Sequence, residues 1–238
     1  SADMRADGRD PEGALSALLS QFGTLGLAPS QKGASASLLL RIGWASGFAI
    51  GAYLAAGLVP RLRDYALRFS ARGMLNGLWV RSMTLDRLAA NGASRDALRR
   101  ALLDSMLEIV APVMEEQHHW SRFSRHALWS MVTSSWAEQF VSIARQLGDH
   151  RRGALEAQAL FALDARIADA APELYPVHAG DQASTCQRRA SCCLYYRSPR
   201  RDFCASCPII PADERLERNR GWVAQQAAGV ASAAAVLA

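Results

Sequence analysis

Residues 94–113 read SRDALRRALLDSMLEIVAPV, and this stretch decides the class of the fold. Its apolar residues recur at spacings of three and four: Leu98, Leu102, Met106, Ile109 and Val113. That spacing aligns them along one face of an α-helix. Ser94 suits the N-cap, and Pro112 is expected to kink or restart the helix. The sequence therefore predicts an amphipathic helix over this range.

Helical signals recur along the rest of the chain. Helices are predicted for four further ranges: 38–58, 128–147, 154–170 and 212–220. Pro60, Gly148 and Pro172 follow the first three and are expected to end them.

One stretch between the predicted helices favours strands. Residues 65–70 and 75–81 are short runs with aromatic and branched side chains, separated by a segment that contains Gly73. Such a pattern predicts a β-hairpin, although a continuous helix is the competing interpretation.

The composition changes near residue 175. Residues 175–211 are rich in Cys, Arg, Pro and Ser and show little periodicity, which predicts an irregular lobe. The predicted fold is therefore mainly α, with a small β-hairpin. Its expected parts are a helical body over 1–174 and a C-terminal lobe with its tail over 175–238.

Charge and composition limit the classes of partner. The chain has 238 residues and a net charge of +5, and Lys32 is its only lysine. No sustained Lys/Arg face with interleaved aromatic residues is visible, so we expect no nucleic-acid partner.

Residues 42–60 carry no charge over a length that could span a bilayer. They are rich in glycine, alanine and serine rather than strongly hydrophobic, so a buried core helix is favoured over membrane contact. Residues 1–11 are polar and lack the pattern of a signal peptide. We expect a cytoplasmic protein whose membrane contact is at most peripheral.

Most of the cysteines gather in one short segment. Four of the five lie within sixteen residues: Cys192, Cys193, Cys204 and Cys207. This clustering favours metal ligation over a disulfide framework. A 2Fe–2S cluster needs two thiolates on each iron, and the C-x-x-C turn can aim two sulfurs at one of them. Cys192 and Cys193 can share the other iron only if the backbone bends there.

Spacing alone leaves two metals open. Structural zinc also takes four cysteines, usually as two C-x(2–4)-C knuckles, whereas this chain has one. Iron–sulfur chemistry is therefore favoured, with a zinc-stabilised binding module without catalysis as the alternative. Cys186 is expected to be a spare or buried thiol, with a substitute ligand as the alternative.

The runs CCLYYRSP at 192–199 and CASCP at 204–208 resemble the signature of the FhuF-type ferric-siderophore reductases. That resemblance implies a 2Fe–2S cluster held by all four cysteines, with no catalytic residue beyond the cluster. It also implies an oxidoreductase that transfers one electron to a ferric siderophore, expected to be of the hydroxamate type, and so releases Fe(II). The body over 1–174 would face the siderophore.

Basic and aromatic residues surround the cysteines. The candidates for substrate binding or donor docking are Arg188, Arg189, Tyr195, Tyr196, Arg197, Arg200 and Arg201. No G-x-G-x-x-G fingerprint for a flavin or nicotinamide is present. The expected electron donor is therefore a separate protein, such as a ferredoxin or an NAD(P)H-dependent reductase.

Overall fold

The computed structural model describes residues 3–4, 30–70, 75–87, 92–198 and 202–237. The fold is mostly helical, as predicted. Its helices are α2 (Gln31–Ser46), α3 (Phe48–Ala56), α4 (Arg95–Ser121), α5 (Arg125–Gln146), α6 (His150–Phe161), α7 (Ala165–Asp169) and α8 (Ala212–Leu237). Its strands are β1 (Asp3–Met4), β2 (Val59–Phe69), β3 (Leu75–Asp86), β4 (Glu173–Ala179) and β5 (Gln182–Arg188). They form two antiparallel sheets, ordered β1-β2-β3 and β4-β5.

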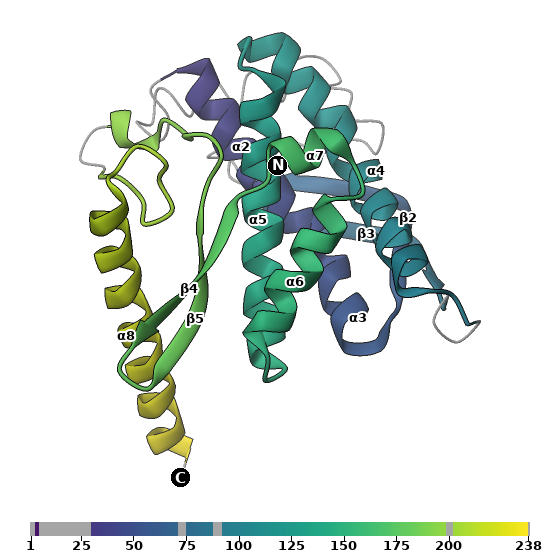
Figure 1. Ribbon diagram of the computed structural model, residues 1–238. Helices are drawn as coiled ribbons and strands as arrows, with labels where there is room; N and C mark the ends of the chain where they lie inside the picture. The colour runs from purple at the N-terminus through teal and green to yellow at the C-terminus, as the bar shows by residue number, and fades with distance from the viewer. Residues whose placement is uncertain (1–2, 5–29, 71–74, 88–91, 199–201, 238) are drawn as a thin grey trace.

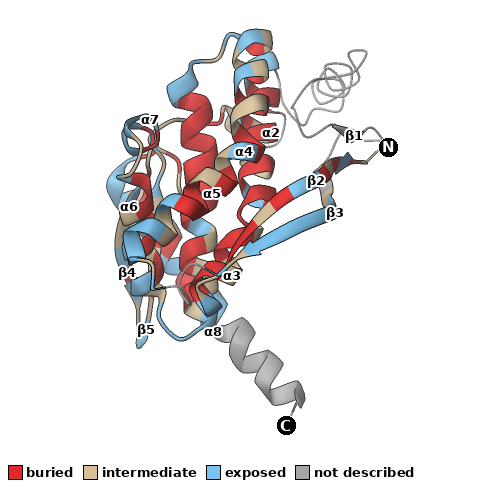
Figure 2. Cartoon of the chain, turned by 90° about the vertical axis from the view of Figure 1, so that its right-hand side faces the viewer, coloured by how far each residue is buried: buried red, intermediate tan, exposed pale blue. Residues whose placement is uncertain are grey.

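Helix α5 runs through the middle of the molecule. Helices α2 and α6 pack along it, and the β4–β5 hairpin lies between α5 and α8 (Figure 1). The side chains of Trp129, Trp136 and Phe140 on α5 are almost completely buried. Buried residues also dominate α2, whereas β3 is largely exposed (Figure 2).

Close contact between α2 and α5 explains why the apolar run around residue 42 is rich in small residues. A Cβ atom at Gly43 would lie about 3.0 Å from the Cβ of Ser135, so only glycine fits there comfortably. The Ser135 hydroxyl donates to the carbonyl of Leu40 at 2.7 Å. The indole of Trp136 donates to the Ser46 hydroxyl at 2.8 Å. These bonds satisfy polar groups that the close packing buries.

The predicted central helices are confirmed. Helix α4 begins after Ser94, whose hydroxyl accepts a hydrogen bond from the amide of Ala97. It continues through Pro112 as one helix, so the expected restart at this residue is wrong. Helix α5 ends before Gly148, whose φ of +94° explains the stop there.

The first apolar helix differs from the prediction at both ends. Helix α2 begins at Gln31, capped by Ser30, so residues 31–37 are helical before the expected start. Gly47 separates α2 from α3, and Gly57 ends α3 with a φ of +61°. Pro60 therefore lies within β2 and does not end the helix.

Length and composition would let Gln31–Ala56 cross a membrane, and it is the one such helix in the described ranges. In the structure, 61% of its most apolar window is buried inside the protein. Helix α2 packs on α4 and α5, as expected for a core helix.

The β-hairpin prediction is confirmed, and the strands are longer than expected. Strands β2 and β3 pair antiparallel from Val59 opposite Asp86 to Phe69 opposite Leu75. The predicted helix over 154–170 is two helices, because residues 162–164 interrupt it between α6 and α7.

The prediction of an irregular lobe from residue 175 is wrong for its first part. Residues 173–188 form the β4–β5 hairpin, and its tight turn uses Gly180 at a φ of +59°. A Gly-Asp pair between two short runs is a hairpin signal that the cysteine-rich composition masked. The predicted helix at 212–220 is confirmed as the start of α8.

A buried carboxylate joins three helices. Glu156 on α6 accepts hydrogen bonds from the Tyr53 hydroxyl at 2.6 Å and the Arg99 guanidinium at 2.9 Å. Burial alone would raise the pKa of Glu156, but these donors hold it below its ordinary value. Because its charge is paired and bonded, Glu156 can remain ionised beside the core.

The contact between α5 and α6 gives a test of the packing. A Cβ at Gly153 would lie 2.3 Å from the carbonyl oxygen of Phe140. Replacing glycine with alanine inside an open helix usually stabilises it by about 0.5–1 kcal/mol. We expect Gly153→Ala instead to destabilise the protein by about 1–3 kcal/mol, because the backbones must separate. Thermal unfolding followed by circular dichroism measures the difference.

The matched control is Gly221→Ala on α8, where an added Cβ meets nothing within 4 Å. This variant should melt at or above the temperature of the parent protein. Equal melting temperatures for the two variants would contradict the packing described.

Candidate metal centre

The adjacent cysteines lie where the backbone turns sharply. Leu194, directly after Cys193, adopts the left-handed conformation with a φ of +61°. Its amide donates to the sulfur of Cys192 at 3.4 Å. The next three residues, Tyr195–Arg197, form a 3-10 turn. The bend that two neighbouring cysteines need in order to serve one iron is therefore present.

The second pair of cysteines is held in a tight turn. The amide of Cys207 donates to the carbonyl of Cys204 at 3.0 Å, which closes the C-x-x-C segment. The Ser206 hydroxyl lies 3.8 Å from the sulfur of Cys204 and donates to it. The side chains of Cys204 and Cys207 therefore both project from the same short turn.

Two contacts tie the cysteine segments together. The amide of Arg189 donates to the carbonyl of Ser206 at 3.0 Å. The rings of Tyr196 and Phe203 stack with their centroids 4.7 Å apart. Each contact joins the chain beside the first pair to the chain beside the second.

The four thiols lie next to one another. Cys192 is close enough to Cys193 and Cys207 for their thiols to shift its pKa, and Cys193 has the same effect on the pKa of Cys204. Cys193 and Cys207 are buried, and the other two are half-buried. The structure brings the four thiols close together, and their ligation of a metal centre stays a prediction.

The arrangement consists of neighbouring pairs. Over the residues that the structure describes, no group of three or more His, Cys, Asp and Glu side chains is placed to hold one metal ion. A 2Fe–2S cluster makes a different demand, since its four thiolates are shared between two irons. Four sulfur donors that contact one another in pairs fit that demand.

The surroundings shift the pKa values of Cys192 and Cys204 in opposite directions. A hydrogen bond from Cys193 and the amide of Leu194 lower the pKa of Cys192 against the effect of burial. A thiol contact with Cys193, together with burial, raises the pKa of Cys204 above its ordinary value. Positive charge from Arg189 acts on Cys204 the other way and favours its thiolate.

Helix α5 anchors the first cysteine pair. The Ser130 hydroxyl accepts a hydrogen bond from the amide of Ser191 at 2.9 Å. The side-chain amide of Gln187 donates to the carbonyl of Ser134 at 3.1 Å. The end of β5 and the chain that follows it are therefore fixed to the most buried helix.

Helix α8 anchors the second pair. Arg218 donates to the carbonyl of Phe203 at 2.6 Å, and Arg215 donates to that of Ile210 at 3.0 Å. The Asn219 amide reaches the carbonyl of Ala205 at 3.4 Å and the Tyr175 hydroxyl at 2.6 Å. Side chains from one helix thus hold a loop that has no regular structure of its own.

An open cavity of about 490 Å³ borders the cysteines and is hereafter called the cluster cavity. Its wall includes Cys193 and Cys204, with Tyr195 beside them. Arg41 and Trp44 from α2 line the same cavity. Trp44 is 68% exposed, so an indole face is available beside the thiols.

The predicted arginines and tyrosines occupy different positions. Arg189 and Tyr195 line the cluster cavity. Arg188 lies 3.8 Å from Glu173 across the hairpin, and Arg197 donates to the hydroxyl of Tyr196 at 3.2 Å. Arg200 and Arg201 lie outside the described residues.

Cys186 lies apart from the other four. It sits in β5, is buried beside Val177 and Val223, and burial raises its pKa to about 11. The thiol therefore stays neutral, as expected of a buried cysteine outside the ligand set.

Residues 189–208 match the family described as the FhuF 2Fe-2S C-terminal domain. This segment is a FhuF-type 2Fe–2S domain. Its cofactor is a 2Fe–2S cluster, which the four cysteines within the match support. Comparison with curated proteins and with solved structures gave no match.

Several residues of the FhuF-type site escaped the sequence analysis. Phe203 stacks on Tyr196, Ser130 holds the first cysteine pair, and Trp44 lines the cluster cavity. Phe203 directly precedes a cysteine, which could have drawn attention to it. Ser130 and Trp44 are far away in sequence, and no local pattern connects them to the cysteines.

The left-handed residue after the cysteine pair gives a test of the FhuF-type site. A non-glycine residue in this conformation costs about 1–2 kcal/mol, and a β-branched residue tolerates it worse than leucine. We expect Leu194→Gly to keep the full iron content and Leu194→Val to lose most of it. Iron and acid-labile sulfide per protein, measured after anaerobic purification, report the outcome.

Retention of a full iron complement by Leu194→Val would show that the bend is not required. Far-ultraviolet circular dichroism of each variant separates loss of the cluster from loss of the fold.

Proposed function

We propose that the protein is a ferric-siderophore reductase, which reduces Fe(III) in a bound siderophore by one electron and releases Fe(II). The single observation that carries this proposal is that the cluster cavity is bordered by thiols of the FhuF-type domain. A substrate in that cavity would lie against Cys193 and Cys204 with no layer of protein between them.

The four clustered cysteines are the proposed ligands: Cys192, Cys193, Cys204 and Cys207. When bound there, the 2Fe–2S cluster supplies a single electron at a time. The four cysteine thiolates would hold it, and the Leu194 amide would keep its hydrogen bond to the Cys192 sulfur. Arg189 places positive charge beside Cys204, which favours the more negative, reduced state.

Reduction by one electron is enough to release the metal. Siderophores hold Fe(III) through hard oxygen donors and bind Fe(II) much more weakly. The balanced reaction takes one ferric siderophore and one electron to one Fe(II) ion and the intact siderophore. The electron comes from a separate protein donor, such as a ferredoxin or an NAD(P)H-dependent reductase.

Residues of α2 position the substrate in this proposal. Trp44 offers an exposed indole to the apolar surface of a hydroxamate chelate, and Leu40 and Leu75 extend that surface. Tyr195 borders the cavity close to the cysteines. The helical body over 1–174 thus contributes to substrate binding.

The chemistry of the thiols favours one cellular compartment. The proposed compartment is the cytoplasm, where cysteines stay reduced. Any membrane contact would be peripheral, because the apolar helix is largely used inside the fold.

Single-turnover reduction tests this function. Anaerobic protein, reduced and freed of excess reductant, is mixed with a ferric trihydroxamate, and a ferrous-specific dye captures the product. We expect one Fe(II) per protein beyond the iron of the cluster, with matching loss of the reduced visible spectrum. Cys207→Ser should lose cluster and activity together.

Cys186→Ser is the matched control, because its thiol lies outside the ligand set, and it should keep both properties. A holoprotein that stays reduced with every ferric chelate offered would overturn the proposal. Stoichiometric zinc in place of iron would overturn it as well.

Trp44 gives a separate test of the substrate cavity. Removing an exposed aromatic platform costs about 1–2 kcal/mol of binding, or about 5–30-fold in affinity. We expect Trp44→Ala to raise the KM for the ferric chelate by about that factor, with the visible spectrum of the cluster unchanged. Trp79→Ala, an exposed tryptophan on β3 outside the cavity, should leave KM unaltered. Equal KM values for the two variants would place the substrate elsewhere.

A further inference from the structure

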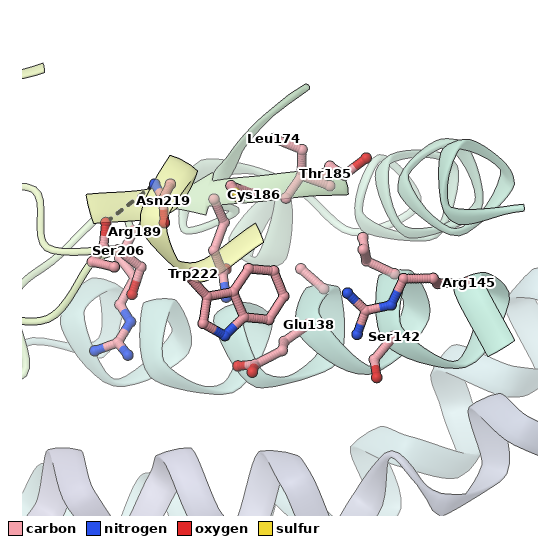
Figure 3. Close-up of a pocket in the computed structure, with 14 residues that line it drawn as sticks. Glu138, Ser142, Arg145, Leu174, Thr185, Cys186, Arg189, Ser206, Asn219 and Trp222 are labelled. Carbon is pink, nitrogen blue, oxygen red and sulfur yellow. Dashed lines mark hydrogen bonds between the residues drawn. The ribbon is translucent and has the colours of Figure 1, made fainter. Parts of the chain in front are cut away.

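A second cavity, hereafter called the α8 cavity, lies beside the C-x-x-C turn. It has no role in the proposed reduction of a ferric chelate. It measures about 280 Å³ and is lined by residues of α5, the β4–β5 hairpin and α8, together with Ala205 and Ser206 (Figure 3). Glu138 and Arg189 border both this cavity and the cluster cavity. The α8 cavity is therefore adjacent to the site of reduction and separate from it.

The wall of the α8 cavity carries more positive than negative charge. Arg145 and Arg189 line it, against the single carboxylate of Glu138. Within the described ranges, no ion pair with a carboxylate is recorded for either guanidinium. A half-buried guanidinium without a carboxylate partner is a ready site for an anion.

An aromatic side chain, Trp222, lines the cavity next to Arg145. Trp222 on α8 is 37% exposed and lines the cavity (Figure 3). The guanidinium carbon of Arg145 lies 5.4 Å from the centre of its indole ring. The stacking keeps Arg145 at the wall of the cavity, where its donors stay available to a ligand.

Polar atoms at the other edge also lack partners. The Nε of Arg189 and the Oε1 of Gln187 are buried and form no hydrogen bond in the described structure. Both residues line the α8 cavity. Both atoms are sealed from solvent, so they mark polar residues at the edge of the cavity and do not themselves contact a ligand.

We propose that the α8 cavity binds a small aromatic anion. Its ring system lies against Trp222, and its carboxylate or phosphate accepts hydrogen bonds from Arg145 and Arg189. This site goes beyond the proposed function, since neither Arg145 nor Trp222 lines the cluster cavity.

The size of the cavity limits the ligand. Pockets for small molecules usually measure about 300–1,000 Å³, so this one is at the low end. It accommodates one or two fused rings with one anionic group. The Cys186 thiol in the wall stays neutral, because burial raises its pKa to about 11, and it therefore does not repel an anion.

Titration calorimetry on the cluster-loaded protein tests the site with a matched series of probes. The series is 2-naphthoate, the neutral 2-naphthamide and the non-aromatic cyclohexanecarboxylate. We expect saturable binding of 2-naphthoate with one site per protein, and at least tenfold weaker binding of the other two. Each comparison isolates one element, the charge or the ring.

Two variants then assign the binding to the α8 cavity. Arg145→Gln should lower the affinity for 2-naphthoate about tenfold or more, because it removes a charge-assisted hydrogen bond. Trp222→Leu should lower the affinity for 2-naphthoate by a similar factor. Arg151→Gln, an exposed arginine on α6 outside the cavity, is the control and should bind as the parent does.

The result that overturns the proposal is equally definite. Absence of saturable binding, or equal affinity in Arg145→Gln and Arg151→Gln, would remove the aromatic-anion site. Ferric-chelate reduction is measured separately on the same samples, so failure here leaves the proposed function standing, and the converse also holds.

Discussion

A short segment with almost no helix or strand must bring four thiols together, and its backbone hydrogen bonds to neighbouring elements meet that requirement. The amide of Arg189 joins the carbonyl of Ser206, and the amide of Ser191 joins the hydroxyl of Ser130 on α5. On the other side, Arg218 and Asn219 of α8 hold carbonyl groups of the C-x-x-C loop. Because two independent helices fix the loop from both sides, the thiols stay adjacent without a sheet or helix beneath them.

The same anchoring decides what surrounds the cysteines. Attachment to α5 brings them next to α2, so that Arg41 and Trp44 share a cavity with Cys193 and Cys204. Helix α8, which holds the other side of the loop, lines a second cavity, with Trp222 in its wall. A motif of twenty residues therefore gains its chemical environment from helices that the motif does not contain.

Local patterns were sufficient for much of the fold. The spacing of apolar residues over 94–113 predicted α4, and Ser94 marked its start correctly. The run around residue 65 predicted the hairpin of β2 and β3. The hairpin at 173–188 was missed because arginine, proline and cysteine concealed the Gly-Asp turn at its tip. The division at residue 174 stays a prediction, as does the cytoplasmic location.

The amino-acid sequence by itself determined that the centre is thiolate-bound, because cysteine spacing is a local property. That spacing left iron–sulfur and zinc open, and the short match over residues 189–208 supports the 2Fe–2S cluster. Only the tertiary structure decided which side chains surround the cysteine segment and line the two cavities beside it. Trp44, Ser130 and Trp222 come from three different helices, and no spacing along the chain encodes their approach. Packing of α2 on α5, and of α8 on the β4–β5 hairpin, brings them there. Contacts between distant segments depend on the whole buried surface and not on any local run of residues.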